Sequence, residues 1–305
     1  MLSFIIRRLL IIVPMALLVI TVTWGLIRIA PGSFYSSEKK LPPAVEANIK
    51  KKYGLDRPWY EQYGIMMRNI VKGDFGDSLK YEGQSVNEIL WRHLPYSAIV
   101  GILAYILALI IGLGAGIIAA LKQNSGFDYG SMSLAMLGLS VPNFVLGPIL
   151  VLIFSLWLYI FPPARWGGIL SLVLPVVTLS AIYAAYIARL TRAGMLEILR
   201  SDYIRTARAK GLDEKTVLLR HAVRGGLIPV ISYTGPALAH LLAGTVVIER
   251  VFAIPGLGKI FIESIQNRDE PLTLGIVAFL SILIMIFNLL VDISYAFLDP
   301  RIRYE

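Results

Sequence analysis

The stretch DYIRTARAKGLDEKTVLLRHAVRGG, residues 202–226, lies between two long apolar runs and carries a cluster of arginines. A single glycine, Gly211, interrupts it near the middle. Before this glycine, apolar residues recur at the spacing of a helix: Leu196, Leu199, Tyr203 and Ala207. Because most of the arginines fall on other faces, the pattern predicts an amphipathic helix that ends at the glycine.

The residues around Gly211 are typical of a helix end followed by a new helix. Lys210 lies in the last turn of the first helix, where a cation suits the negative end of the helix dipole. Gly211 is the expected C′ residue, and Asp213 is suited to cap the second helix. We expect Gly225 and Gly226 to loosen that helix before the next apolar run. A loop that only fixed membrane topology would need charge alone, and not two capped helices.

The composition indicates a membrane protein. Of 305 residues, 56% are hydrophobic and 16% are charged, with a mean hydropathy of +0.69 and a net charge of +9. A soluble domain has about 25% charged residues. The cations gather at the ends of apolar runs and lack an aromatic stacking platform, which argues against nucleic-acid binding. The absence of cysteine excludes disulfides, zinc–thiolate sites and iron–sulfur clusters.

Six apolar runs approach the length of about 20 residues that crosses a hydrocarbon core. They cover residues 9–27, 98–121, 131–161, 169–188, 227–248 and 272–298. The third run is long and is interrupted at Pro142 and Asn143. The first has no small-residue cleavage site after it, so we expect an uncleaved span rather than a signal peptide.

Lys and Arg in the short loops predict the orientation of the spans. Cations precede the first span, follow the second and the sixth, and crowd residues 190–226, and six spans place all of them on one side. That side is the cytosol, and both chain termini lie there. We therefore expect three parts: a first span (1–30), an extracytoplasmic helical segment (31–97) and a five-span core (98–305) that contains the cytosolic loop 190–226.

The segment 31–97 carries its own helix signals. Pro42 and Pro58 are each suited to open a helix, and Ser85 with Glu88 forms a capping box. We expect the helix after Ser85 to lie along the membrane surface until Pro95 redirects the chain into the second span. The segment serves either as a lid over the outer mouth or as a docking surface for an external partner.

Several short motifs resemble one family along the whole chain. RTARAKGL in the basic stretch resembles the coupling loop of membrane subunits in ATP-binding-cassette (ABC) importers, in the form used by the peptide branch. Aligned on Gly211, the family-wide glutamate position holds Arg205. Five further motifs match that branch in order: RIAPGS (28–33), GDFGDS (73–78), AALKQN (119–124), ERVFAIPGLGK (249–259) and LDPRIRY (298–304). The closest fit is the B-type permease subunit of bacterial oligopeptide importers.

This resemblance implies an all-α polytopic membrane protein in the bacterial inner membrane. Its architecture would be that of a type I ABC importer membrane subunit, with six transmembrane helices and an extracytoplasmic insertion after the first. It implies a second homologous permease subunit, two ATP-binding cassette ATPase subunits, an extracytoplasmic peptide-binding protein and a peptide substrate. The ATPase-coupling residues would be Tyr203, Ile204, Arg205, Thr206, Ala207, Arg208, Ala209, Lys210, Gly211 and Leu212.

The chain itself lacks the signature of an ATPase. A phosphate-binding loop needs G-x-x-x-x-G-K-[ST], whereas Gly258 and Lys259 are followed by isoleucine and lack the spacing. We therefore expect a non-catalytic subunit that binds no cofactor or metal, with ATP and Mg²⁺ held by partner ATPases.

Polar residues inside apolar runs and residues at a break in a span are candidates for lining a translocation path. They are Pro142, Asn143, His240, Asn288 and Asp292. For the last three, hydrogen bonding within the protein is the competing interpretation.

Two other functions compete with the importer hypothesis. An ion-coupled peptide carrier needs carboxylates or histidines deep in the membrane to hold the coupling ion. Asp292 alone gives this hypothesis little support. An intramembrane hydrolase would use Ser140 and His240 as nucleophile and base. Within the importer family, dipeptides, glutathione and nickel remain alternative cargoes to oligopeptides.

Overall fold

The computed structural model describes residues 2–30, 51, 54 and 56–298, and most of them are helical. The long helices are α1 (Leu2–Ile29), α4 (Val86–Leu121), α5 (Gly126–Ser140), α7 (Ile169–Leu199), α11 (Ile228–Val251) and α13 (Glu270–Leu298). Shorter helices are α3 (Trp59–Val71), α6 (Asn143–Leu150), α8 (Asp202–Ala209), α9 (Glu214–Thr216), α10 (Val223–Gly226) and α12 (Leu257–Gln266). Two π-helical segments, η2 (Val151–Trp157) and η3 (Val217–Ala222), continue α6 and α9. The predicted helix at Pro42 lies outside the described residues.

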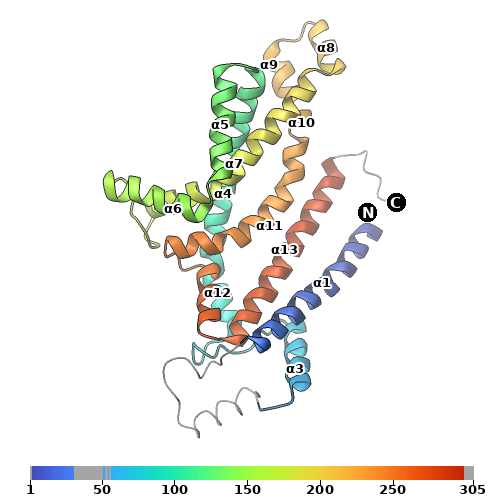
Figure 1. The fold of residues 1–305 in the computed structure, drawn as a ribbon. Helices are drawn as coiled ribbons and strands as arrows, with labels where there is room; N and C mark the ends of the chain where they lie inside the picture. The colour runs from blue at the N-terminus through green and yellow to red at the C-terminus, as the bar shows by residue number, and fades with distance from the viewer. Residues whose placement is uncertain (1, 31–50, 52–53, 55, 299–305) are drawn as a thin grey trace.

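The helices form an elongated bundle in which α4 and α7 pack along each other and α5 and α11 pack against α7 (Figure 1). Its main core includes Val100, Ala104, Leu179, Ile187 and Ile248, each fully buried. At one side α1 packs along α13. Figure 1 shows α8 and α9 at one end of the bundle and α3 at the other, with the first residues of α1 and the last of α13 pointing toward the α8 end.

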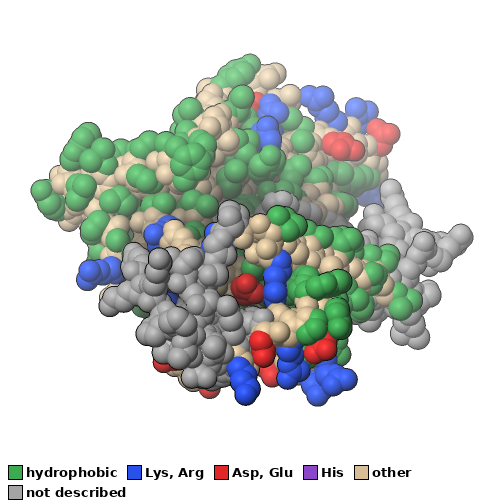
Figure 2. Space-filling view, turned by 60° about the horizontal axis from the view of Figure 1, so that its bottom comes forward, with side chains coloured by type: hydrophobic (Ala, Val, Ile, Leu, Met, Phe, Trp, Pro, Cys, Tyr) green, Lys and Arg blue, Asp and Glu red, His purple; other side chains and the backbone are tan. Residues whose placement is uncertain are grey.

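The surface agrees with a bilayer as solvent. Four described helices are long and apolar enough to cross a membrane: α1, α4, α7 and α13. Figure 2 shows large apolar patches over the upper part of this face, with many Lys, Arg, Asp and Glu side chains along its lower edge and at its upper right. The spans expected at 9–27, 169–188 and 272–298 each lie within one helix, and the span expected at 227–248 coincides with α11 except for its N-cap residue Leu227. The total of six spans remains a prediction, because the described residues give four, or five with one bent pair.

The expected span over 131–161 is sharply bent at the interruption predicted from Pro142 and Asn143. Helices α5 and α6 meet at Val141 and Pro142 with a bend of 106°, and Figure 1 shows α6 projecting away from the bundle. Val141 adopts an extended conformation with φ −93° and ψ 114°. The cause is local, since proline disfavours the helical conformation in the residue before it and lacks an N–H.

The change of chain direction expected at Pro95 is wrong. Helix α4 begins at Val86 with Ser85 as its N-cap, as predicted, and the Glu88 amide donates to the Ser85 hydroxyl at 3.2 Å. The helix then continues through Pro95 to Leu121 instead of turning. Val86, Ile89 and Leu90 are buried against α12 and α13. This packing holds the first turns in line with the rest of the helix, so α4 runs across the expected boundary at residues 97 and 98, and the division into three parts stays a prediction.

Glycines allow the helices to approach closely in the bundle. A Cβ built on Gly116 would lie 2.5 Å from the Thr191 side chain, and one on Gly112 would lie 2.7 Å from Ile187. At the α8 end, a Cβ on Gly194 would lie 2.3 Å from the carbonyl oxygen of Gly226. The contact between α7 and α10 therefore requires glycine at position 194.

Gly194→Ala is expected to destabilise the fold by about 1–3 kcal/mol, the usual cost of overpacking. The obstructing atom belongs to the backbone, so no side-chain rotation can relieve the clash. The measurement is the thermal unfolding midpoint of the purified chain in detergent. Gly130→Ala in α5 is the matched control, because a Cβ there meets nothing within 4 Å. Equal midpoints for the two variants would contradict the close approach.

Candidate coupling site

The basic stretch forms a compact helical unit at one end of the molecule. Helix α7 runs to Leu199, beyond the expected span end at 188, and α8 begins three residues later at Asp202. The apolar stripe predicted on one helix is therefore divided between α7 and α8. Leu196, Leu199 and Ala207 pack on the buried side as predicted, but Tyr203 is 45% exposed, and its neighbour Ile204 is fully buried in its place.

The predicted glycine turn is present and has the hydrogen bonds of a Schellman motif. The Gly211 amide donates to the Arg208 carbonyl at 3.0 Å, and the Leu212 amide donates to the Ala207 carbonyl at 3.4 Å. Gly211 has φ +77° and open space where a Cβ would stand. Its requirement for glycine is therefore conformational and not steric.

The second helix is capped as the sequence predicts. The Thr216 amide donates to the Asp213 carboxylate at 3.1 Å, and the hydrogen bonding with Thr216 lowers the pKa of Asp213. An ion pair spans the turn, because the Arg208 guanidinium donates to Glu214 at 2.5 and 3.1 Å. This guanidinium lowers the pKa of Glu214. Both carboxylates therefore stay ionised at neutral pH and hold the two helices together across Gly211.

An apolar cluster beneath the turn fixes the unit to the bundle. Its buried members are Ala120, Met195, Ile204, Ala207, Val217 and Ala222. They come from α4, α7, α8 and η3, so the turn is anchored on four elements. Gly225 and Gly226 do not loosen the chain as expected. Both lie in α10. Gly226 packs against Met195, and a Cβ at Gly226 would lie 2.6 Å from the Met195 sulfur.

The outward surface of this unit presents most of the predicted coupling residues. Ile204 and Ala207 face the cluster, and the other eight are exposed: Tyr203, Arg205, Thr206, Arg208, Ala209, Lys210, Gly211 and Leu212. We call these eight residues the coupling face. Arg205 extends from it with a side chain 72% exposed and an ion pair to Asp202 at 3.3 Å. A cationic, exposed surface on an anchored turn suits contact with another protein.

A buried ion pair that the sequence analysis missed supports this end of the bundle. The Arg192 guanidinium on α7 donates to both carboxylate oxygens of Asp128 on α5, at 2.6 and 2.8 Å. The Asp128 side chain is 1% exposed and also accepts from the Asn124 amide at 3.0 Å. In the sequence, the only sign of this ion pair is that Asp128 and Arg192 each lie near the end of an apolar run.

The structure describes the side chains of three of the five candidate path residues. Pro142 and Asn143 stand at the bend between α5 and α6, and the buried Oδ1 of Asn143 lacks a hydrogen-bond partner in the described structure. Asn288 lies on α13 and is exposed. His240 lies on α11 and Asp292 lies on α13, and the structure does not describe their side chains. The five stay predictions as path residues.

The hydrolase hypothesis gains nothing from the geometry. The Ser140 hydroxyl donates to the Met136 carbonyl of its own helix at 2.8 Å, which is a common hydrogen bond for serine in a helix.

At the opposite end, a buried carboxylate explains the motif ERVFAIPGLGK. Glu249 at the end of α11 is fully buried and accepts from the amides of Gly258 and Lys259 at 2.7 and 3.1 Å. It also accepts from the Ser97 hydroxyl at 2.6 Å, and Ser97 in turn accepts from the Leu257 amide at 2.8 Å. Glu249 and Ser97 thus satisfy the first amides of α12 and tie it to α4 and α11.

A second buried carboxylate explains the motif GDFGDS. Asp269 precedes α13 and accepts from the Leu272 amide at 3.2 Å, so it caps that helix. It also accepts from the Ser78 hydroxyl and from the amides of Leu79 and Lys80 at 3.2 and 3.1 Å. This carboxylate therefore attaches the loop after α3 to the start of α13. Neither Glu249 nor Asp269 was among the residues that the sequence analysis selected.

The comparisons with known proteins identify the family. Residues 112–304 match the model of the binding-protein-dependent transport system inner membrane component, and residues 1–88 match the model of the N-terminal part of such membrane components. The chain therefore belongs to this family, and it is a multi-pass membrane protein. The resemblance inferred from the motifs is confirmed.

Individual relatives refine this class. The chain is 46% identical over 306 residues to the oligopeptide transport system permease protein OppB of Haemophilus influenzae, with 100% of both chains covered. It is 44% identical over 287 residues to the dipeptide transport system permease protein DppB of Bacillus subtilis, covering 94% of this chain and 93% of the relative. Among solved structures, an inward-facing MetNI methionine ABC transporter matches with a TM-score of 0.58 and 16% identity, covering 69% of this chain and 96% of that chain. The predicted fold class, an all-α membrane subunit of a type I ABC importer, is confirmed.

Proposed function

We propose that this chain forms half of the translocation path of an ATP-driven importer for oligopeptides. The other half would come from a second homologous permease subunit, and an extracytoplasmic binding protein would deliver the peptide. Two ATPase subunits, which bind ATP and Mg²⁺, would contact the coupling face. This chain would carry no catalytic residue and would hold no cofactor.

The observation that carries this proposal is the coupling face itself. Eight exposed residues surround a Schellman turn whose buried side is anchored on α4, α7, α8 and η3. A force applied to such a turn passes directly into long helices instead of being absorbed by a flexible loop. The similarity to curated oligopeptide permeases over the full chain length supports the cargo.

The basic residues indicate how the protein is oriented in the membrane. The coupling face and both helix ends nearest the chain termini point the same way in Figure 1, and α3 lies at the other end. With the cations inside, the coupling face lies in the cytosol of a bacterium and α3 lies outside the inner membrane.

The test is uptake of a labelled oligopeptide by proteoliposomes that contain all subunits and the binding protein. We expect uptake that requires ATP inside the vesicles and both ATPases. Uptake that persists with a proton gradient and without the ATPases would favour the ion-coupled carrier and refute the proposal. Competition with unlabelled dipeptide, glutathione or Ni²⁺ would decide among the cargoes of this family.

A further inference from the structure

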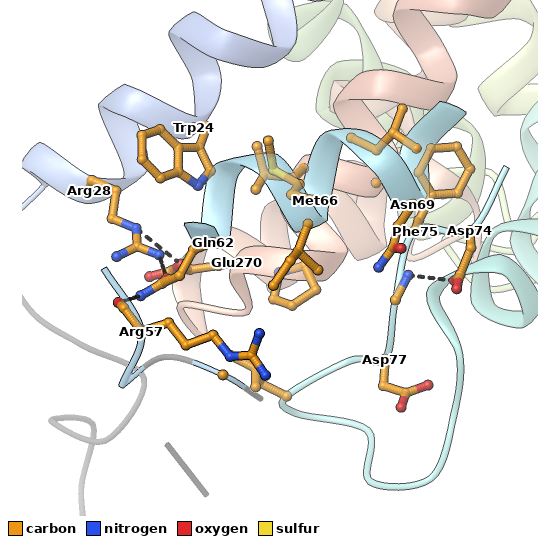
Figure 3. A pocket seen from close by; sticks show the side chains of 18 residues that line it. Trp24, Arg28, Arg57, Gln62, Met66, Asn69, Asp74, Phe75, Asp77 and Glu270 are labelled. Atoms are coloured by element: carbon orange, nitrogen blue, oxygen red, sulfur yellow. Dashed lines mark hydrogen bonds and ion pairs between the residues drawn. The ribbon is translucent and has the colours of Figure 1, made fainter. Parts of the chain in front are cut away.

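A cavity of about 340 Å³ lies at the end of the molecule that carries α3. It is formed by the last turns of α1, by α3, by the loop at residues 74–79 and by the first turns of α13. Figure 3 shows Met66 between two groups of side chains, with Trp24, Arg28, Gln62 and Glu270 on one side and Asn69, Asp74 and Phe75 on the other. This volume falls within the range of small-molecule sites, about 300–1,000 Å³.

The cavity combines an apolar surface with separated charges of opposite sign. Apolar side chains line its middle: Ile65, Met66, Ile70, Phe75, Leu79 and Leu274. Arg28 is already engaged, because it donates to Gln62 and lies 3.8 Å from Glu270. Among the residues that the structure describes, the Arg57 guanidinium has no ion pair or hydrogen bond. Arg57 is therefore the cation without a partner among the described residues that line the cavity.

The free anions are on the loop that forms the other wall. Asp74 uses one carboxylate oxygen to accept from the Gly76 amide at 2.9 Å and keeps the other available. Asp77 lines the same wall, is exposed and has no side-chain partner among the described residues. A ligand that complements this arrangement carries a negative group for Arg57 and a positive, hydrogen-bond-donating group for the two aspartates.

The position of the cavity points to a lipid. It lies where two of the membrane-crossing helices, α1 and α13, reach their ends. Trp24 on α1 contacts Tyr63 and Trp59 on α3, with ring centroids 5.3 and 6.4 Å apart. Such aromatic clusters mark the level of the lipid headgroups.

An apolar ridge on α1 leads to the same level. Leu10, Val13 and Leu17 are 69%, 59% and 42% exposed. Their helical spacing places these three side chains on the same face of α1 as Trp24, which lines the cavity. Acyl chains lying along this ridge would bring a headgroup to the mouth of the cavity.

We propose that the cavity binds the headgroup of an amine-bearing zwitterionic phospholipid of the phosphatidylethanolamine class. Arg57 binds the phosphate, and Asp74 and Asp77 accept hydrogen bonds from the primary ammonium. The acyl chains lie against the exposed ridge of α1. A choline headgroup is discriminated against, because its methylated nitrogen has no N–H to donate, whereas a primary ammonium has three. This inference depends on the membrane orientation and not on the identity of the cargo.

The test is lipid retention by the purified full-length chain, measured by native mass spectrometry after delipidation and addition of equal amounts of two lipids. Phosphatidylethanolamine is expected to be retained about tenfold more than phosphatidylcholine, as the loss of charge-assisted hydrogen bonds implies. The double variant Asp74→Asn and Asp77→Asn should abolish this preference. The asparagine at position 74 keeps an oxygen for the Gly76 amide, so the turn survives.

Two further variants separate the components of the site. Arg57→Gln should lower retention of both lipids and leave their ratio unchanged, because both carry the phosphate. Asp56→Asn, a neighbouring exposed acid that does not line the cavity, should change nothing. Equal retention of the two lipids by the unmodified chain would overturn the proposal. Displacement of bound lipid by a free tripeptide at the cavity would also overturn it, and would assign the site to peptide. Uptake by the full importer is read separately, so either failure leaves the proposed function to its own test.

Discussion

Gly211→Pro is expected to leave the chain inserted in the membrane and to abolish its hold on the ATPase subunits. Gly211 has φ +77°, whereas the proline ring fixes φ near −65°. Proline also removes the amide that donates to the Arg208 carbonyl. The turn cannot form, so the exposed residues on its two sides lose their relative positions. The measurement is co-purification of the ATPases with the tagged chain, together with peptide uptake.

Two milder substitutions at the same position serve as controls. A side chain at position 211 meets no neighbour within 4 Å, so the only cost is that of the left-handed conformation. Gly211→Ala should cost about 1–2 kcal/mol, and Gly211→Asn should cost less, since asparagine tolerates this conformation. We expect ATPase capture to fall in the order Gly, Asn, Ala, Pro. Normal assembly of the proline variant would show that the ATPases bind elsewhere.

The turn at Gly211 could be predicted from the sequence because its signals are local. A glycine C′ residue, a cation in the last turn and an aspartate two positions later act within a few residues of one another. Local signals of this kind determine helix ends. The N-cap at Ser85 was predicted correctly for the same reason, since the Glu88 amide donates to its hydroxyl. The return contact of the Glu88 side chain that completes a capping box stays a prediction.

Predictions failed where packing between distant segments decides the structure. Pro95 ought to end a helix by its local chemistry, yet the contacts of Val86, Ile89 and Leu90 with α12 and α13 keep α4 continuous. The interruption at Pro142 was visible in the sequence, but a bend of 106° was not. The direction of α6 depends on its contacts with α7 and α11, which no local pattern contains.

Buried carboxylates were the largest omission, and the reason is the same. Glu249 binds a serine 152 residues earlier in the chain, and Asp269 binds one 191 residues earlier. Each acid lies at a helix end, where sequence reasoning treats a charge as solvated. Their burial becomes visible only when the partners are brought together. In the sequence, the motifs that contain Glu249 and Ser78 indicate only a resemblance to the importer family. The structure shows what these residues do physically, because they form the buried hydrogen bonds at the starts of α12 and α13.

Glu249→Ala is expected to be the most destabilising single substitution among those considered for this chain. It would leave the Ser97 hydroxyl and the amides of Gly258 and Lys259 buried without their acceptor. Each unsatisfied donor costs about 1–3 kcal/mol, so we expect a loss of about 3–5 kcal/mol, as for other broken buried charge networks. The thermal unfolding midpoint in detergent and the yield of chain in the membrane would measure it.

Glu249→Gln distinguishes the role of hydrogen bonding from that of charge. The glutamine oxygen can accept from both α12 amides, and its NH₂ group can donate to Ser97, so most of the network can be rebuilt. We therefore expect an unfolding midpoint between those of the unmodified chain and Glu249→Ala. Glu263→Gln in α12 is the matched control, because that acid is partly exposed and its contacts with Tyr81, Arg250 and Lys259 are 3.4–3.9 Å long. If Glu263→Gln destabilised the chain as much as Glu249→Ala, general loss of negative charge would explain the effect. An effect confined to Glu249 would instead show that one acceptor holds α4, α11 and α12 together.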